Sequence, residues 1–480
     1  MRRLSGQDNG FLHLETPTAP MNSMAIGVLV PAVGADGQPQ VLTMEDVRRH
    51  FAERLGELPS LRWRIERVPL RLHHPVAIED PDFDLDYHLR HVTLEGDGSP
   101  ADLDRLVAQL GARHMDRRHP LWQFTLVDGL ADGRQAGIYR VQHALQDGVA
   151  AYTTFSRVFS GPDDPIVAPP EPWQPDVPPT RRRLVVDALR DLGRNLRRLP
   201  RLAAKTRRGM AAVKERQATA TVHVPGFVTD TPPCSLNDAF TLEHSYARSS
   251  LPLADVKRVK NAADVSLNDV VLAIVATGLR RYLLARGDLP DRPLVANVPV
   301  GFEPPDAPVR QFGNRFTSIT TSLATDVEDP WARLQAISAV ATEAKACLDL
   351  MGPEMMADWL EVVPPFIAEP GIRSLQKRRR EHREEAEHSV VISNIKGPSE
   401  HWAFETSAVE SLHIQGPPSN GVGPNVMLWS YGDRLLIGIL AFADAMPDPH
   451  ELAGYLVEAL DELVALAEAK QTVDAFTDLS

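Results

Sequence analysis

The spacing of apolar and polar residues along the first third of the chain predicts alternating strands and helices. Short apolar runs at 24–30, 122–126 and 138–142 are typical of strands. Apolar residues recur with helical spacing over 44–55, 103–115 and 149–159. In the last of these helices, Tyr152, Phe155 and Phe159 are expected to form one buried stripe.

The second half of the chain returns to the same mixed pattern. A helix is predicted over 267–284, with Ser266 as its N-cap and an end near Gly287. Further helices are predicted over 330–347 and 449–469, and strands over 294–300, 315–323, 389–393, 425–431 and 435–442. No internal sequence repeat is found. The pattern therefore predicts an α/β fold in two parts.

The composition changes abruptly between these two parts. Eight prolines occur in the 18 residues from Pro162 to Pro179, and they remove the hydrogen-bond donors that helices and sheets need. From Arg181 to Arg216, 13 lysines and arginines oppose three acidic residues, with leucines interleaved at helical spacing. We expect a basic amphipathic surface that Pro200 interrupts. The predicted segments are an N-terminal domain over 1–161, a linker and basic segment over 162–225, and a C-terminal domain over 226–480.

Length, composition and charge exclude several classes of protein. A chain of 480 residues with 43% hydrophobic and 24% charged residues fits a soluble protein with more than one core. The net charge of −13 argues against nucleic-acid binding. No apolar run is long enough to span a membrane, and no signal peptide is visible. Two cysteines, Cys234 and Cys347, exclude a disulfide framework, so a cytoplasmic location is expected.

The segment QHALQDG at 142–148, between a predicted strand and a predicted helix, is the strongest candidate for chemistry. An imidazole with a pKa near 6.5 can accept a hydroxyl proton at neutral pH, so His143 is a candidate general base. Asp147 suits an N-cap or an ion pair that holds the loop, and Gly148 suits the turn. A structural histidine followed by a plain turn is the alternative. The chain has no nucleophile elbow and no Walker A loop, which favours direct attack without a covalent intermediate.

Other histidines are weaker candidates. The pairs His73-His74 and His88-His91 have no nearby set of carboxylates or cysteines that would complete a metal site. We expect these histidines to lie in loops or on the surface.

The segment at 142–148 resembles the HHxxxDG signature of the chloramphenicol-acetyltransferase/condensation-domain superfamily. Other segments resemble motifs of the bacterial wax ester synthase/diacylglycerol acyltransferase family, and they follow the family's order over nearly the whole chain. These segments are the opening at 11–21, PLW at 120–122, Asn268-Asp269 at a helix start, FGNR at 312–315, SNIKGP at 393–398 and NGVG at 420–423.

The resemblance implies a fold of two chloramphenicol-acetyltransferase-like α/β domains with the active-site tunnel between them. It implies an acyl-CoA-dependent O-acyltransferase that transfers a fatty acyl group to diacylglycerol or a long-chain alcohol, with His143 as the base. Acyl-CoA would be a co-substrate, and no bound cofactor or metal is expected. Two alternatives stay open. One is a different acceptor, such as a polyketide, a glycolipid or an amine, and the other is a non-catalytic lipid-binding protein.

The motifs also supply candidates for substrate binding or for stabilising an oxyanion. These residues are Gln142, Trp122, Asn268, Ser393, Asn394, Gly421 and Gly423. Each has a structural alternative: core packing for the tryptophan, the first turn of a helix for Asn268, an ordinary turn for 393–398, and a hairpin loop for the glycines.

The chain departs from the family pattern at two places. Gln142 stands where the signature has its first histidine, and a glutamine cannot titrate, so the base implied by the resemblance is His143. The Gln142 side chain is expected to line the tunnel or to bond the backbone. Gly301-Phe302 stands where the family commonly has serine and arginine, which puts a polar role there in doubt.

The basic segment at 181–216 has two interpretations. Its arginines would attract an anionic membrane or lipid inclusion by about 1 kcal/mol for each basic residue near the surface. Alternatively, its leucines pack onto the rest of an acidic protein. The sequence leaves both open.

Overall fold

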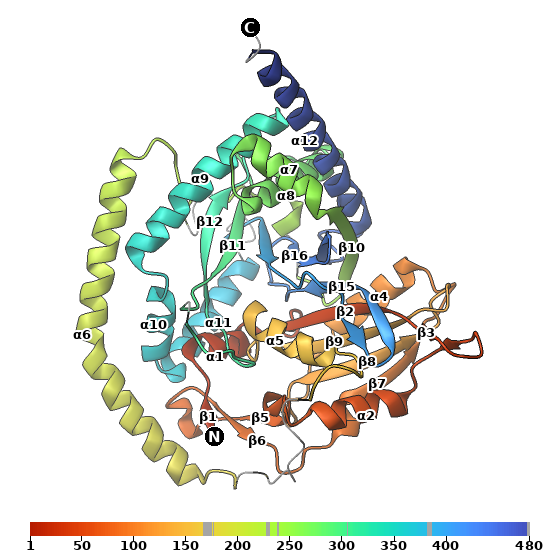
Figure 1. Ribbon diagram of the computed structural model, residues 1–480. Coiled ribbons are helices and arrows are strands. Elements are labelled where there is room, and N and C mark those ends of the chain that lie inside the picture. The colour runs from red at the N-terminus through yellow and green to blue at the C-terminus, as the bar shows by residue number, and fades with distance from the viewer. Residues whose placement is uncertain are drawn as a thin grey trace.

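The computed structural model describes residues 1–166, 175, 177–226, 231–237, 240–304, 306–381 and 386–477. Within these residues, two six-stranded sheets lie one above the other, and helices cover their outer faces (Figure 1). The mixed α/β fold predicted from the sequence is confirmed. Residues 167–174 and 176 of the proline-rich stretch at 162–179 lie outside the described residues.

The first sheet carries the strand that leads to the QHALQDG segment. Its strands, in spatial order, are β14 (Ala403–Phe404), β15 (Ser407–Gln415), β2 (Asn22–Val30), β9 (Gln135–Gln142), β8 (Trp122–Asp128) and β7 (Leu89–Thr93). Helix α2 (Met44–Arg54) and helix α5 (Gly148–Val158) share an aromatic core with one face of this sheet. Helix α4 (Pro100–Gly111) packs on the opposite face through Leu103 and Val107.

The second sheet lies above the first in Figure 1. Its strands, in spatial order, are β10 (His244–Pro252), β17 (Arg434–Phe442), β16 (Asn425–Tyr431), β13 (Val390–Ile395), β11 (Val295–Gly301) and β12 (Phe316–Ser322). One face packs on α7 (Leu253–Ala263), α8 (Leu267–Leu284), α9 (Pro330–Met351) and α12 (Pro449–Thr477). Ser266 caps α8 as predicted. The other face points toward the first sheet and leaves room for a cavity.

The remaining described elements are short or peripheral. They are β1 (Arg2–Arg3), β5 (Trp63–Glu66), β6 (Val76–Glu79), the pair β3 (Ala32–Val33) and β4 (Pro39–Gln40), helices α1 (Gly6–Leu14), α3 (Leu85–His88), α10 (Met355–Val362) and α11 (Pro365–Glu381), and 3-10 turns at Pro59–Arg62, Pro69–Arg71 and Ser235–Asn237.

Strands β14 and β15 belong to the second half of the sequence but complete the first sheet. Strand β15 pairs antiparallel with β2, with Ile414 opposite Ala25 and Gln415 opposite Met24. The turn between β14 and β15 is fixed by Glu405, whose carboxylate bonds the buried His50 of α2 at 3.1 Å. The predicted division at 161/162 and 225/226 stays a prediction, but the two halves of the sequence share this sheet.

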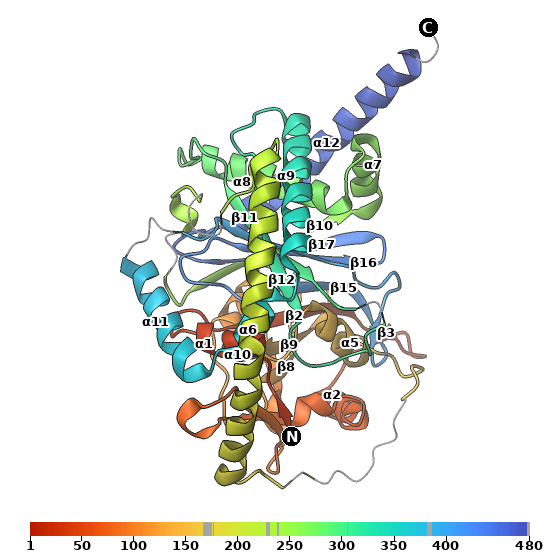
Figure 2. The same cartoon turned by 90° about the vertical axis from the view of Figure 1, so that its left-hand side faces the viewer.

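Helix α6 (Arg181–Thr219) runs along the outside of both halves (Figures 1 and 2). The predicted interruption at Pro200 is wrong, because the helix continues through that residue. The lost backbone donor costs about 3 kcal/mol in a helix interior, and packing on both sides offsets it. Leu184 packs against Val76 and Ile78, and Leu202 packs against α10.

Within the described ranges, no single helix is long and apolar enough to cross a membrane. Helices α7 and α8 pass the length and composition test only as a pair, and they are bent by 105° at the break between them.

Candidate active site

A cavity of about 990 Å³ lies between the second sheet and the end of β9, where His143 follows. Its floor is one face of that sheet. Because side chains alternate along a strand, every second residue of β16, β13, β11 and β12 points into the cavity. These floor residues are Asn425, Met427, Trp429, Val391, Ser393, Ile395, Asn297, Pro299, Gly301, Phe316 and Ser318. The roof is formed by α5, the His143 loop and residues of α1.

His143 is held from three directions. Its backbone N–H donates to the Met21 carbonyl at 2.7 Å, which fixes the loop at the end of β9. Its ring stacks on the Phe11 ring, with centroids 4.3 Å apart. The centroid of the Phe316 ring lies 6.1 Å from that of His143. Its Nδ1 lies 2.9 Å from the Gln146 carbonyl oxygen. A carbonyl only accepts, so Nδ1 carries the proton and Nε2 is left with a free lone pair.

The electrostatic setting keeps this imidazole neutral. Burial lowers the pKa of His143 below 6.5, and the hydrogen bond to Gln146 and the charge of Asp147 offset only part of that effect. A neutral ring with a free Nε2 is the form that can accept a proton.

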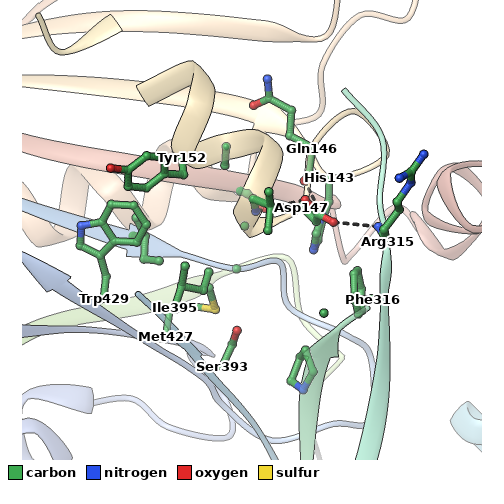
Figure 3. Close-up of a pocket in the computed structure, with 18 of the residues that line it drawn as sticks. His143, Gln146, Asp147, Tyr152, Arg315, Phe316, Ser393, Ile395, Met427 and Trp429 are labelled. Carbon is green, nitrogen blue, oxygen red and sulfur yellow. Dashed lines mark hydrogen bonds between the residues drawn. The ribbon is translucent and has the colours of Figure 1, made fainter. Parts of the chain in front are cut away.

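Asp147 closes the loop at the start of α5. Its Oδ1 accepts from the N–H groups of Val149 and Ala150 at 3.1 and 3.0 Å, as the N-cap of α5. Its Oδ2 accepts from the Arg310 guanidinium at 2.5 Å. The same oxygen accepts from the Arg315 N–H at 2.7 Å (Figure 3). The carboxylate therefore ties the His143 loop to the second half of the chain.

The FGNR segment completes this connection. Gly313 has a φ of +91°, a left-handed conformation that favours glycine, and its N–H donates to the Leu145 carbonyl at 2.6 Å. The Asn314 side-chain amide donates to the His143 carbonyl at 3.0 Å and to the Asp8 carboxylate at 2.9 Å. The FGNR segment thus holds the backbone of the His143 loop.

Gly148 lets α5 approach the floor of the cavity. A Cβ at this position would lie 2.6 Å from Cδ1 of Ile395, closer than packed carbon atoms come. Ile395 ends β13, so this contact sets the distance between the start of α5 and the second sheet.

Ser393 and Asn394 line the cavity, as expected of substrate-binding candidates. In Figure 3, Ser393 lies across the cavity from His143, beside Met427. Gly301 also lines the floor, so the position where the family commonly has serine presents only backbone there.

The other candidates do not form the walls of this cavity. Gln142 is buried, and its Oε1 accepts from the Ala144 N–H at 2.5 Å, the backbone bond expected as one of its two roles. Trp122 is buried in the first core and donates to the Leu61 carbonyl at 2.6 Å. Asn268 lies in the first turn of α8. Their roles toward substrate stay untested predictions.

Gly421 and Gly423, in the NGVG segment at 420–423, do not line the cavity. A Cβ at Gly423 would lie 1.9 Å from the Ser389 carbonyl oxygen, and Gly421 has a φ of +71°. Both glycines are therefore explained by close backbone packing and turn geometry. A role toward substrate stays a prediction.

The expectation that the paired histidines lie in loops or on the surface is wrong for His88, which is buried in α3, whereas His73 and His74 lie in a loop and His91 is exposed. His73, His74 and His88 are buried. His88 lies 2.8 Å from the Trp122 carbonyl through Nδ1, and burial lowers its pKa to about 4. The sequence pattern did not reveal that these three rings are buried. No group of three or more potential metal ligands occurs in the described part of the chain.

Three residues of the site were not identified from the sequence. Arg310 pairs with Asp147 from 163 positions away, and Phe11 stacks on His143 from another helix. Tyr152, expected in a buried stripe, is 37% exposed and lines the cavity, whereas Phe155 and Phe159 are buried. In the sequence, only the position of Arg310 two residues before the FGNR segment could have pointed to it.

Comparisons with known proteins agree with this geometry. A model described as the wax ester synthase/diacylglycerol acyltransferase catalytic domain matches residues 4–271, and the model of the corresponding C-terminal domain matches residues 312–464. One relative from Mycobacterium tuberculosis is 34% identical over 96% of both chains, and a second is 33% identical over 98% of this chain and 99% of its own. Both carry the provisional name diacylglycerol O-acyltransferase.

Solved structures agree on the fold. The wax ester synthase/diacylglycerol acyltransferase of Marinobacter aquaeolei is 26% identical and superposes with a TM-score of 0.66, covering 98% of this chain and all of that one. The first condensation domain of the calcium-dependent antibiotic synthetase superposes with a TM-score of 0.56 at 16% identity, over 97% of this chain and 96% of its own. At that identity the second likeness shows the fold alone.

Proposed function

The chain belongs to the wax ester synthase/diacylglycerol acyltransferase family, and from this premise we propose that His143 is the general base of its acyl transfer. The chain is an acyltransferase. The proposed reaction moves a fatty acyl group from acyl-CoA to the hydroxyl of diacylglycerol or of a long-chain alcohol. The observation that carries the proposal is the neutral imidazole of His143, with Nε2 free in a largely apolar cavity.

The chemistry follows from the position of the two nitrogens. Nε2 accepts the proton of the acceptor hydroxyl as its oxygen attacks the thioester carbonyl. The carbon–sulfur bond then breaks, and the protonated ring returns the proton to the leaving thiolate. Because Nδ1 remains bonded to the Gln146 carbonyl throughout, the ring does not rotate between the two proton transfers. No covalent acyl-enzyme is required.

The apolar walls suit both lipid substrates. Phe11, Leu14, Met21, Met24 and Val141 line the cavity near the His143 loop and offer no hydrogen-bond partners to compete for a hydroxyl. Water excluded by such walls cannot hydrolyse the thioester, and the electrostatic interactions of the imidazole are strengthened. Ser393 and Asn394 are the proposed donors for the oxyanion, since Ser393 points into the cavity from the floor and Asn394 also lines it.

We also propose that α6 brings the enzyme to the surface of a membrane or lipid inclusion. Leu184 and Leu202 pack inward, but Leu189 and Leu196 are 53% and 57% exposed. These two residues are seven positions apart, so they share one side of the helix, among arginines. A basic surface with exposed leucines suits an anionic lipid surface.

The test of His143 is release of thiol from acyl-CoA in the presence of an acceptor. We expect His143→Ala to reduce turnover at least about 100-fold, the usual contribution of a general base. His91→Ala is the matched control, because His91 lies on β7 and does not line the cavity. Circular dichroism checks that each variant is folded. A folded His143→Ala enzyme with turnover near that of wild type would refute the assignment. A panel of diacylglycerols, alkan-1-ols and amines identifies the acceptor.

A further inference from the structure

Helix α1 carries a buried carboxylate that the proposed reaction does not use. Asp8 is 3% exposed, and in the part of the chain that the structure describes it makes hydrogen bonds but no ion pair. Burial raises the pKa of Asp8, and its hydrogen bonds to Asn314 and Ser5 offset only part of that effect. Because a buried polar group costs free energy unless hydrogen bonds satisfy it, the partners of Asp8 indicate its role.

The two oxygens of this carboxylate have different partners. Oδ2 accepts from the Ser5 N–H at 2.9 Å, and the Ser5 hydroxyl accepts from the Asp8 N–H at 3.1 Å, so the two residues form a capping box at the start of α1. Oδ1 accepts from the Asn314 N–H at 2.7 Å and from the Asn314 side-chain amide at 2.9 Å. A capping box needs only the first oxygen. The second oxygen connects α1 to the FGNR segment.

Through Asn314 this connection reaches the backbone of the proposed base. The amide nitrogen that donates to Asp8 also donates to the carbonyls of His143 and Ala144, at 3.0 and 3.3 Å. Helix α1 and the His143 loop therefore meet at a single side-chain amide. The position of this amide fixes one relative to the other.

The same helix carries the ring that covers His143. Phe11 lies one turn after Asp8, so the two side chains share one side of α1. The planes of the Phe11 and His143 rings are 19° apart. Gln7, next to Asp8, donates from Nε2 to the Phe316 carbonyl at 2.6 Å, and Phe316 lies beside His143 in Figure 3. Helix α1 is thus fastened to the segment at 314–316 just before it presents Phe11.

The beginning of α1 is held independently of Asp8. A Cβ at Gly6 would lie 2.1 Å from the Leu360 carbonyl oxygen of α10, and the Gly6 N–H donates to the Glu361 carboxylate at 2.9 Å. Loss of the Asp8 side chain would therefore leave the start of the helix in place. Its Phe11 end would be free to tilt away from His143.

We propose that Asp8 is a positioning residue for the general base. Through Asn314 it holds α1 where the Phe11 ring stays stacked on the imidazole of His143. Without this connection the imidazole loses its cover, and its Nε2 loses a fixed direction toward the acceptor hydroxyl. The inference rests on the proposed role of His143 as the base.

Helix α2 offers a control for the alternative that Asp8 only caps a helix. Asp46 occupies the same position of a capping box with Thr43, with matching hydrogen bonds of 2.9 and 3.2 Å. Asp46 is exposed to solvent and does not line the cavity. Asp46→Ala therefore removes the same capping bonds at a distance from His143.

Steady-state acyl transfer separates positioning from capping. We expect Asp8→Ala to lower kcat roughly 10- to 100-fold with little change in the KM for acyl-CoA, because a misplaced catalytic group slows the reaction without weakening donor binding. Asp8→Asn keeps an oxygen that can accept from Asn314, so it should recover most of kcat. Asp46→Ala should retain the kcat of wild type. A folded Asp8→Ala enzyme with the kcat of Asp46→Ala would refute the positioning role.

A chemical readout keeps this inference separate from acyl transfer. Diethyl pyrocarbonate modifies accessible neutral imidazoles, and mass spectrometry of the peptide that contains His143 gives the rate at this residue. We expect the rate to rise severalfold in Asp8→Ala but not in Asp46→Ala. Asn314→Ala removes the shared amide without touching the capping box, so it should show the same rise even if Asp8→Ala does not fold.

The two readouts distinguish the possible failures. If modification of His143 accelerates as expected but His143→Ala retains turnover, the proposed function fails and the positioning of the ring stands. If the rate at His143 is unchanged in folded Asp8→Ala and Asn314→Ala proteins, Asp8 does not hold Phe11 on the imidazole and the inference is wrong.

Discussion

At the scale of single residues, the reactivity of the site depends on one hydrogen bond and one stacked ring. The Gln146 carbonyl fixes which nitrogen of His143 carries the proton, and Phe11 covers one face of the ring. Both contacts remove water from the imidazole, so they set its pKa as well as its orientation.

This setting predicts the pH dependence of the reaction. Burial lowers the pKa of His143, and the neutral form is the active one, so activity is lost only as pH falls through a value below 6.5. The logarithm of kcat/KM, measured by chromatography of the product between about pH 4.5 and 8, should bend below that value. In Phe11→Ala, the ring gains water and the bend should move up toward 6.5. A bend at or above 6.5 in the wild-type enzyme would contradict the buried, neutral base.

The pair of Asp147 and Arg310 predicts a loss of stability. Their side chains are 6% and 8% exposed, and loss of Asp147 leaves the buried Arg310 with Glu303 as its remaining carboxylate partner. It also removes the N-cap of α5. We expect Asp147→Ala to lower the free energy of unfolding by about 3–5 kcal/mol, measured by urea denaturation. Asp116→Ala, which breaks a pair with the exposed Arg118, should cost less than about 1 kcal/mol. Adding Arg310→Met to Asp147→Ala should restore part of the loss, and strictly additive effects would argue against a coupled pair.

The residues of the site that could be predicted from the sequence are those of one contiguous segment. His143, Asp147 and Gly148 lie within six positions, so the order strand, histidine, aspartate-glycine, helix identifies them. Phe11 and Arg310 come from segments far away in the chain, and only the fold brings them to His143. Tyr152 contacts Trp429, as Phe155 does, but it is exposed and not buried, because helical spacing does not reveal that this side of α5 borders a cavity.

At the scale of elements, the distance between α5 and β13 is set by the absence of a side chain at Gly148. A methyl group there would meet Cδ1 of Ile395 at 2.6 Å, and overpacking of this kind costs about 1–3 kcal/mol. We expect Gly148→Ala to lower both the melting temperature and kcat/KM. Ile395→Val lacks the Cδ1 atom, so the double variant should recover most of both. Failure of the double variant to recover would place the effect in the backbone of the turn.

The exposed side of α6 predicts binding to anionic vesicles. Replacing Leu189 and Leu196 with serine removes apolar side chains that contribute to the lipid-facing side of the helix. The fraction of protein that floats with phosphatidylglycerol vesicles should fall severalfold in Leu189→Ser/Leu196→Ser. Leu284→Ser/Val457→Ser, on α8 and α12, should float like wild type, since these residues are exposed elsewhere. Flotation that depends neither on anionic lipid nor on α6 would contradict the proposed contact.

Most individual helices and strands could be predicted from the spacing of apolar residues, because a buried face leaves a regular apolar pattern. The helix over Leu267–Leu284 and the strand over Asn425–Tyr431 have the predicted bounds. The continuation of α6 through Pro200 did not follow, since local chemistry argues for a break and distant packing overrides it.

At the scale of the whole molecule, the two halves depend on each other for a complete core. Strand β15 lies beside β2, and Trp429 and Tyr431 of the second half belong to the same buried cluster as Trp122 and Phe124 of the first. The sequence predicted two parts but not the pairing of β15 with β2. Tertiary packing decides which strands pair, and this choice leaves no local pattern in the sequence.

This shared core predicts a single unfolding transition. Urea unfolding followed by far-UV circular dichroism and by tryptophan fluorescence should give coincident curves, although a chain of 480 residues with two sheets would ordinarily unfold in steps. Two separated transitions would show that the halves are stable on their own.

The place of β14 and β15 in the first sheet also has a consequence for how such a chain is inherited. A recombination event within 162–179 that brought in a foreign N-terminal half would place a new β2 beside the resident β15 and a new α2 beside the resident Glu405. The imported half would have to match a strand and a turn encoded more than 200 codons downstream. We therefore expect the two halves to pass between genomes as one unit, although a recombination point in the proline-rich stretch would leave every described helix and strand intact.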